Sequence, residues 1–130
     1  MSKFWVAGAT GFLGSHLLQT LAERGHQVTA VSKSGGKVSG VDVAAVDILN
    51  ERAVTESARG ADGAFLVTGR VSRDRDDAEL LHRDNVLGTE TALRALRAAG
   101  IKRVVVASTS GTLAVSRDPD RIADESCRAP

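Results

Sequence analysis

Three glycines near the N-terminus constrain the fold of this chain more than any other feature. Gly8, Gly11 and Gly14 follow a short apolar run over residues 4–7, which is typical of a buried parallel strand. After the glycines the apolar residues take on the spacing of a helix. The pattern therefore predicts a strand, a tight turn and a helix. We expect the apolar stripe of this helix to comprise Leu13, Leu17 and Leu21.

A junction of this kind has a specific chemistry. The first N–H groups of a helix have no partner within the helix, and together with the helix dipole they favour an anion. Gly8 permits the tight turn, Gly11 lets phosphate groups approach the backbone, and Gly14 lets the helix pack closely on the strand. We interpret the turn as a binding site for the pyrophosphate of a dinucleotide. A purely structural glycine-rich turn is the alternative.

Composition excludes several classes of function. At 130 residues with 42% hydrophobic content, the chain fits one domain with a packed core. A net charge of +1 and 3% aromatic residues argue against a nucleic-acid partner. With one cysteine, Cys127, and three histidines that lack metal-ligand spacing, we expect neither a disulfide nor a metal site. No apolar run suggests a membrane span, and we expect a cytoplasmic location.

Strand-like and helix-like segments alternate along the rest of the chain. We expect strands over residues 27–32, 41–46, 64–67 and 101–107, and helices over residues 50–58 and 78–99. We interpret the mixed-charge stretch 70–77 as a solvated connection, and the alternative is that Arg70 or Arg73 reaches a substrate or the cofactor phosphates. The alternation predicts an α/β fold with a doubly wound parallel sheet, in which the five strands take the spatial order 3-2-1-4-5. On the helix over residues 78–99 we expect an apolar stripe of Leu80, Leu87, Thr91 and Ala95.

The end of the second predicted strand bears on the choice of cofactor. Ser32 and Lys33 stand there, and no carboxylate follows them directly. In dinucleotide-binding folds an acidic residue at this place bonds the ribose hydroxyls, whereas a basic residue accommodates a 2′-phosphate. Lys33, with Lys37 further along, therefore favours NADP over NAD. The alternative is that both are ordinary loop lysines.

Polar and small residues follow the other strands at the same edge of the predicted sheet. Asp47 either hydrogen-bonds an adenine amino group or caps the helix that follows it. Thr68 and Gly69 close the fourth strand and leave room for a ligand. After the fifth strand, Ser108 and Thr109 begin a cluster of hydroxyl side chains.

Four motifs carry a family resemblance: the glycine motif at residues 8–16, Asp47-Ile48, the Asn85-Val86-Leu87-Gly88-Thr89 segment, and residues 104–110. Together they resemble the extended short-chain dehydrogenase/reductase family, and within it the NAD-dependent epimerase/dehydratase group and dihydroflavonol-reductase-like enzymes. The resemblance implies a Rossmann domain that carries a smaller C-terminal substrate domain, and hydride transfer to or from a nicotinamide. The cofactor-binding set that follows is Gly8, Thr10, Gly11, Phe12, Leu13, Gly14, Ser32, Lys33, Asp47, Ile48, Val67, Thr68, Gly69, Asn85, Ala107 and Ser108.

The resemblance also implies a catalytic hydroxyl after the fifth strand, and a Tyr with a Lys four residues later on the next helix. Thr109 falls at the position of the hydroxyl, but the chain contains no tyrosine and stops at Pro130. We therefore expect residues 1–130 to be a dinucleotide-binding domain that lacks the substrate domain, either as part of a longer enzyme or as a naturally short protein. The implied enzyme is a reductase or an epimerase/dehydratase acting on a small carbonyl or hydroxyl substrate.

Two alternatives of another class remain. The missing tyrosine fits a sensor that binds NAD(P) without turning it over. An interaction module is the other alternative, because a sheet that ends at the fifth strand leaves residues 104–107 as an uncovered edge. Such an edge can pair with another chain, for example in a homodimer.

Overall fold

A six-stranded sheet in the order β3-β4-β2-β1-β5-β6 forms the centre of the computed structural model, which describes residues 1–112 and 118–127. The strands are β1 (Lys3–Ala7), β2 (Gln27–Ser32), β3 (Gly36–Val38), β4 (Val41–Ala45), β5 (Gly63–Leu66) and β6 (Val104–Val106). The longer helices are α1 (Phe12–Glu23), α2 (Glu51–Ala58) and α4 (Gly88–Ala98), and the shorter ones are η1 (Arg75–Asp77), α3 (Ala78–Leu81), η2 (His82–Leu87) and η3 (Ser110–Thr112).

The five predicted strands are parallel and take the predicted order, now as β4-β2-β1-β5-β6. The sixth strand, β3, is antiparallel to β4 and occupies residues that the sequence analysis left in a loop. Ser39 and Gly40 join the two strands, with φ angles of 48° and 82°. Two positive φ values between paired residues are typical of a two-residue hairpin turn. The sequence Ser39-Gly40 could therefore have predicted this hairpin.

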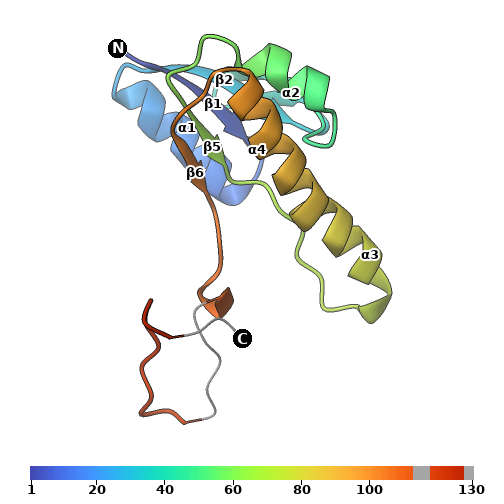
Figure 1. Ribbon diagram of the computed structural model, residues 1–130. Helices are drawn as coiled ribbons and strands as arrows, with labels where there is room; N and C mark the ends of the chain where they lie inside the picture. The colour runs from blue at the N-terminus through green and yellow to red at the C-terminus, as the bar shows by residue number, and fades with distance from the viewer. Residues whose placement is uncertain (113–117, 128–130) are drawn as a thin grey trace.

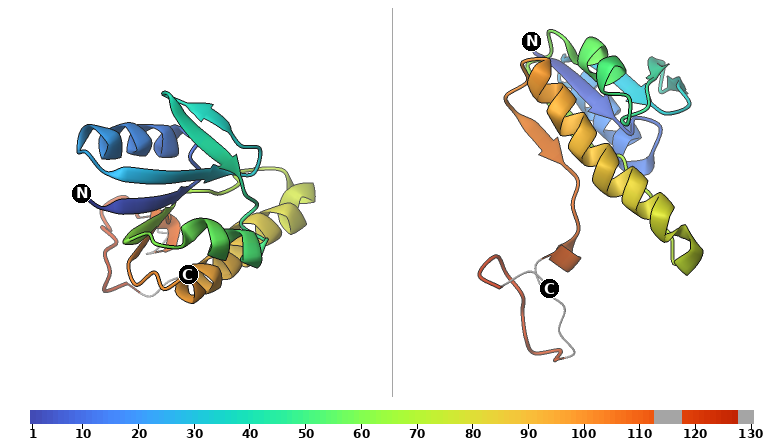
Figure 2. Two further views of the ribbon diagram at one scale, coloured as in Figure 1. Left: turned by 90° about the horizontal axis from the view of Figure 1, so that it is seen from above. Right: turned by 45° about the vertical axis from the view of Figure 1, so that its right-hand side comes forward.

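Helices cover both faces of the sheet (Figures 1 and 2). Helix α1 lies against one face, while α2 and α4 lie side by side against the other. Trp5 of β1 is fully buried on the second face, and its indole N–H donates to Ser57 Oγ of α2 at 3.0 Å. The central strands β1 and β2 are thus covered on both faces, and ligands have access to them mainly at their ends.

Helix α1 presents the predicted stripe at Leu21, which is buried, and at Leu17, which is partly buried against the core, but not at Leu13. Its buried residues are Gly14, Leu18 and Leu21, whereas Leu13 is 53% exposed. In the first turn of the helix Gly14 is the residue that meets the backbone of Gly8, and Leu13 lies outside the contact with the sheet. The assignment of Leu13 to the core stripe was therefore wrong.

The predicted helix over residues 78–99 is present as three consecutive segments, α3, η2 and α4. The middle segment is a π-helix, whose wider turns shift the side chains relative to an α-helical repeat. Ala95 is buried as predicted, but Leu87 is 43% exposed and Leu80 is half-buried. Figure 1 shows why, because α3 and η2 extend past the edge of the sheet and have no layer to pack against.

Strand β6 is shorter than the predicted strand over residues 101–107. Ile101 belongs to the turn after α4, where its N–H donates to the carbonyl oxygen of Leu96 at 3.0 Å. Within the described residues β6 pairs with β5 alone, and Val105 is 58% exposed. The predicted edge strand is therefore present, with apolar side chains on its surface.

The contact between Gly14 and Gly8 gives a stability prediction. A Cβ on Gly14 would lie 2.8 Å from the carbonyl carbon of Gly8, so Gly14→Ala must push α1 away from the turn. We expect a loss of about 1–3 kcal/mol in the free energy of unfolding, measured by urea denaturation, even though alanine is the better helix former. The exposed variant Gln19→Ala serves as the control and should change stability by less than about 0.5 kcal/mol. Equal stability of Gly14→Ala and the unmodified chain would contradict the close packing.

Candidate functional site

The turn between β1 and α1 is built almost entirely from backbone. Gly8 has a φ of +86°, and its N–H donates to the carbonyl oxygen of Val31 at 3.1 Å. A Cβ at Gly8 would lie 2.8 Å from the backbone nitrogen of Thr68. The turn is closed by the N–H of Gly11, which donates to the carbonyl oxygen of Gly8 at 3.0 Å. Only glycine satisfies both the conformation and the space at position 8.

Helix α1 begins at this turn without a side-chain cap in the described structure. Gly11 is the N-cap residue, and its carbonyl oxygen accepts from the N–H of Ser15 at 2.9 Å. The N–H groups at the first helical positions, Phe12 and Leu13, have no intrahelical acceptor by the geometry of a helix. Such donors, together with the helix dipole, form a cradle that suits a phosphate group.

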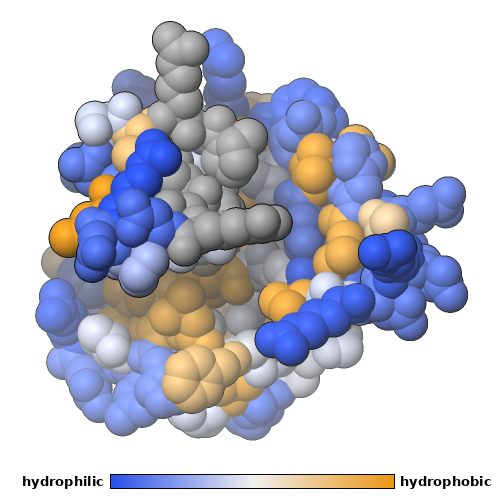
Figure 3. All heavy atoms as spheres, turned by 90° about the horizontal axis from the view of Figure 1, so that it is seen from below, coloured by the Kyte–Doolittle hydropathy of each residue, from blue (hydrophilic) through white to orange (hydrophobic). Residues whose placement is uncertain are grey.

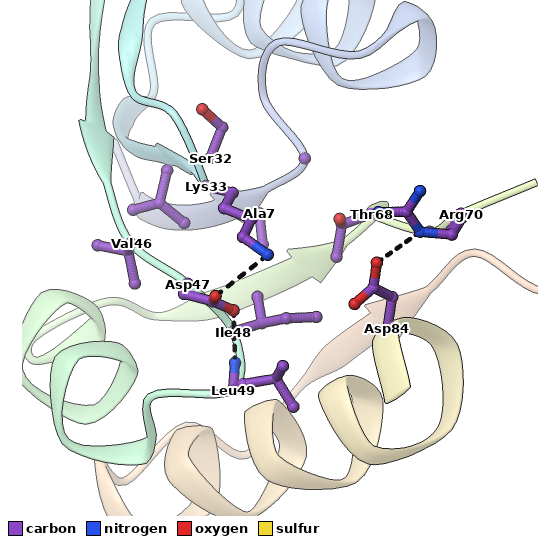
Figure 4. Close-up of a pocket in the computed structure, with 13 residues that line it drawn as sticks. Ala7, Ser32, Lys33, Val46, Asp47, Ile48, Leu49, Thr68, Arg70 and Asp84 are labelled. Carbon is purple, nitrogen blue, oxygen red and sulfur yellow. Dashed lines mark hydrogen bonds and ion pairs between the residues drawn. The ribbon is translucent and has the colours of Figure 1, made fainter. Parts of the chain in front are cut away.

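A cavity of about 240 Å³ lies beside the turn, at the carboxyl ends of β1, β2, β4 and β5 (Figure 4). Apolar side chains form much of its wall, and four charged side chains stand around it in two pairs. A second hollow of about 270 Å³ shares Gly8, Lys33 and Thr68 with it and extends to Thr10 and Gly11. The lining of the first cavity is Ala7, Gly8, Val31, Ser32, Lys33, Val46, Asp47, Ile48, Leu49, Thr68, Gly69, Arg70 and Asp84.

Lys33 and Asp47 form the first charged pair, with 3.5 Å between Nζ and Oδ2. Asp47 Oδ1 also accepts from the N–H of Leu49 at 3.0 Å. The alternative that Asp47 caps α2 was wrong, because Asn50 is the N-cap and its Oδ1 accepts from the N–H of Ala53 at 3.1 Å. The carboxylate of Asp47 therefore faces the cavity from a short turn that precedes the helix.

Lys37, the second lysine of the sequence argument, lies elsewhere. It belongs to the β3–β4 hairpin and pairs with Asp42 at 3.2 Å. Among the described residues it lines neither hollow, so the structure gives it no place near the proposed 2′-phosphate. Ser32, by contrast, lines both hollows and is 8% exposed, and its Oγ accepts from the N–H of Gly35 at 3.0 Å.

The second charged pair joins Arg70, after β5, to Asp84 in the π-helical turn. Arg70 Nε donates to Asp84 Oδ2 at 2.7 Å, and Arg83 donates to Asp84 Oδ1 at 2.8 Å. The hydrogen bonds from Arg83 and Arg70 lower the pKa of the Asp84 carboxyl to about 2. The interpretation of residues 70–77 as a solvated connection was therefore wrong at its first residue, which is a wall of the cavity.

Sequence reasoning did not assign Asp84 or Leu49 to the site, and it left Arg70 unassigned. Their positions in the sequence could have indicated two of these residues, since Arg70 directly follows the predicted site residues Thr68 and Gly69, and Asp84 directly precedes Asn85. Asn85 does not line the cavity. Its side chain instead bonds the backbone of Arg70, which fixes the loop that follows β5.

Several predicted residues lie outside the two hollows. Phe12 and Leu13 are 86% and 53% exposed at the start of α1, next to the turn. Ala107, Ser108 and Thr109 follow β6, where the chain leaves the sheet (Figure 1), and the carbonyl oxygen of Thr109 accepts from the N–H of Thr112 at 3.1 Å. Seen from below, the same molecule shows hydrophobic areas of surface next to hydrophilic ones (Figure 3). The candidate catalytic hydroxyl and the cavity are thus separate features of the described structure.

In the described residues, no helix is long and apolar enough to cross a bilayer. These residues also contain no group of three or more His, Cys, Asp or Glu side chains that could hold a metal ion.

The sequence matches the NAD dependent epimerase/dehydratase family over residues 4–129. This chain belongs to that family. A candidate dihydroflavonol 4-reductase of Synechocystis sp. is 35% identical over 98% of the chain, and cinnamoyl-CoA reductase 1 of Petunia hybrida is 30% identical over 94%. The structure of UDP-glucose 4-epimerase from Thermus thermophilus in complex with NAD matches 98% of the chain, with a TM-score of 0.83 and 26% identity.

The similarity covers only part of these epimerase/dehydratase relatives. The chain spans 38% and 40% of the length of the two reductases and 44% of the Thermus thermophilus epimerase chain. The matched part of these relatives is the part that corresponds to the six-stranded sheet and its helices.

The Asp84 cluster gives a prediction about pH. Because the folded chain holds the pKa of Asp84 at about 2, below the ordinary 3.8, its ionised form stabilises the fold above about pH 4. That stabilisation is lost as the pH falls through about 2. We expect Asp84→Asn to be less stable than the unmodified chain at pH 6, and the difference to vanish by about pH 2, in urea titrations at each pH.

A second variant checks the cause. Arg83→Met removes the hydrogen bond that lowers the pKa of Asp84 the most, so the loss of stability should begin at a higher pH than in the unmodified chain. A stability difference between Asp84→Asn and the unmodified chain that stays constant down to pH 2 would rule out this origin.

Proposed function

We propose that residues 1–130 form the NAD(P)-binding domain of an extended short-chain dehydrogenase/reductase-type oxidoreductase. The whole enzyme would be a reductase or an epimerase/dehydratase acting on a small carbonyl or hydroxyl substrate. The observation that carries the proposal is the uncapped start of α1 above a turn in which a Cβ at Gly8 or Gly14 would collide with backbone. Such a turn beside a cavity at the carboxyl edge of a parallel sheet suits a dinucleotide.

Each part of the cofactor has candidate residues in this chain. The N–H groups at the start of α1, with Thr10 and Gly11, would hold the pyrophosphate. The 240 Å³ cavity would hold the adenosine, with Asp47 accepting from the adenine amino group and Ile48, Thr68 and Gly69 forming walls. Other members of the proposed set are Val67, which lines the second hollow, and Phe12, Leu13, Ala107 and Ser108. Asn85 would act through the loop after β5, whose backbone it bonds.

The bound nicotinamide would supply the hydride donor or acceptor. The residues of this chain would bind and orient, and we propose that the Thr109 hydroxyl orients the substrate oxygen by a hydrogen bond. Since these 130 residues include no tyrosine, the chain itself offers no tyrosine as the proton donor.

We propose that the domain prefers NADP, because Lys33 stands at the end of β2 and lines both hollows. Its partner is Asp47, but the Lys33 side chain is 67% exposed and exposed ion pairs contribute only about 0–1 kcal/mol. A 2′-phosphate would offer Lys33 a stronger, doubly charged partner. The epimerase structures from Thermus thermophilus and Brucella ovis contain NAD, and Lys33 is our reason for expecting a different preference here.

Isothermal titration tests both the binding of a nicotinamide dinucleotide and the preference for NADP. The unmodified chain should bind NADPH about tenfold more tightly than NADH, which corresponds to about 1.4 kcal/mol. Lys33→Ala should remove this preference and leave the affinity for NADH nearly unchanged, while Lys37→Ala, outside the cavity, serves as the matched control with the preference intact. No binding of either nucleotide would overturn the proposed function, whereas equal binding of both would overturn only the preference.

A sensor that binds the cofactor without turnover is the second candidate. The coding sequence after Pro130 distinguishes the two candidates, because a continuation that contains Tyr-x-x-x-Lys supports the enzyme and its absence supports the sensor.

A further inference from the structure

Asn85 holds the backbone of Arg70 through two hydrogen bonds. The Arg70 N–H donates to Asn85 Oδ1 at 2.7 Å, and Asn85 Nδ2 donates to the carbonyl oxygen of Arg70 at 2.9 Å. The amide side chain thus binds the donor and the acceptor of one residue at once, as a neighbouring strand would. This fixes the loop after β5 at a point fifteen residues away in the sequence.

The side chain of Arg70 is fixed as well. Its Nε donates to Asp84 at 2.7 Å, and Asp84 is held in turn by Arg83 at 2.8 Å. Asp84 and Asn85 are adjacent in η2, so one π-helical turn holds both the backbone and the guanidinium of Arg70. The guanidinium plane is therefore set before any ligand arrives, which reduces the entropy lost on binding.

The surroundings of Arg70 suit a flat, neutral group. It lines the cavity together with Val31, Val46 and Ile48, and its side chain remains 41% exposed. Figure 4 shows Arg70 and Asp84 on one side of this space and Asp47 and Ile48 on the other. The space between them is thus bounded by a planar cation on one side and by an apolar side chain on the other.

We propose that Arg70 is an adenine-binding residue, whose guanidinium stacks on the purine ring, and that Asn85 is its positioning residue. The inference rests on the proposed function, because it requires an adenine nucleotide in this cavity. Arginine stacks on aromatic rings through its delocalised plane, and this contact leaves the bond to Asp84 in place.

A phosphate is the less suitable partner for Arg70. The Asp84 carboxylate, at 2.7 Å from Nε, would repel a phosphate and compete with it for the guanidinium. Arg70 is also absent from the lining of the second hollow, which contains Thr10 and Gly11 at the glycine turn. The phosphate groups therefore have their own site, and Arg70 faces the adenosine cavity.

Adenosine carries no phosphate, so its binding distinguishes stacking of Arg70 on the adenine from an interaction of Arg70 with phosphate. We would titrate the full 130-residue chain with adenosine, AMP and NADP⁺ and follow the amide chemical shifts by NMR. Arg70→Ala should weaken all three ligands by the same factor of about three to ten. Arg70→Lys keeps the charge but loses the plane, so it should show the same loss. Arg73→Ala, in the same loop but outside the cavity lining, is the matched control and should bind like the unmodified chain.

A double-mutant cycle tests the role of Asn85. Asn85→Ala should weaken adenosine in the unmodified chain but cause no further loss in the Arg70→Ala background, because its effect passes through Arg70. A general structural defect would instead weaken binding in both backgrounds. The amide spectrum shows whether Asn85→Ala is folded, and Asp84→Asn offers a second way to release the guanidinium if it is not.

The outcomes separate this inference from the proposed function. If the unmodified chain binds NADP⁺ and adenosine but Arg70→Ala binds adenosine equally well, the stacking role is wrong and the proposed function stands. If Arg70→Lys binds like the unmodified chain, the contact is one of charge and the stacking role is again wrong. If the unmodified chain binds neither ligand, both proposals fall.

Discussion

The close contact between the start of α1 and the end of β1 is the constraint on which the site depends. The carbonyl group of Gly8 lies where a side chain at position 14 would otherwise stand, and the space next to Gly8 is filled by the backbone after β5. Three backbone segments therefore meet with no side chain between them. This arrangement exposes the first N–H groups of the helix and brings the end of β5 to the edge of the same cavity.

The cavity combines an apolar wall with cations that carboxylates already hold. Lys33 is paired with Asp47, and Arg70 with Asp84. The two pairs differ in accessibility, since Lys33 is 67% exposed and Asp84 is 20% exposed. The exposed pair is the one that a ligand can open at low cost, whereas the Asp84 pair is braced by Arg83 and is better suited to hold a wall in place.

The π-helical turn links the helix layer to this wall. Residues 82–87 continue the axis of α4 beyond the sheet, where a regular helix would have no layer to contact. Gly88 begins α4 with a Cβ position only 2.7 Å from Ile48 Cδ1, so the helix is pressed against the cavity floor at that point. Just before this contact, Asp84 and Asn85 lie in the π-helical turn, and both bond Arg70. π-helical turns are frequent at functional sites.

The sequence by itself determined the strand order, the strand-to-helix turn and the residues at the carboxyl edge, because periodicity and glycine placement are local properties. It led to the family, and it placed Lys33 and Asp47 in the cofactor-binding set, both of which line one cavity. It did not determine the exposure of Leu13, the β3 strand or the place of Arg70. Arg70 is placed in the cavity by bonds to residues 84 and 85, which lie fourteen and fifteen positions further along the chain. Such contacts arise only when segments far apart in the chain pack together, so tertiary structure alone decided them.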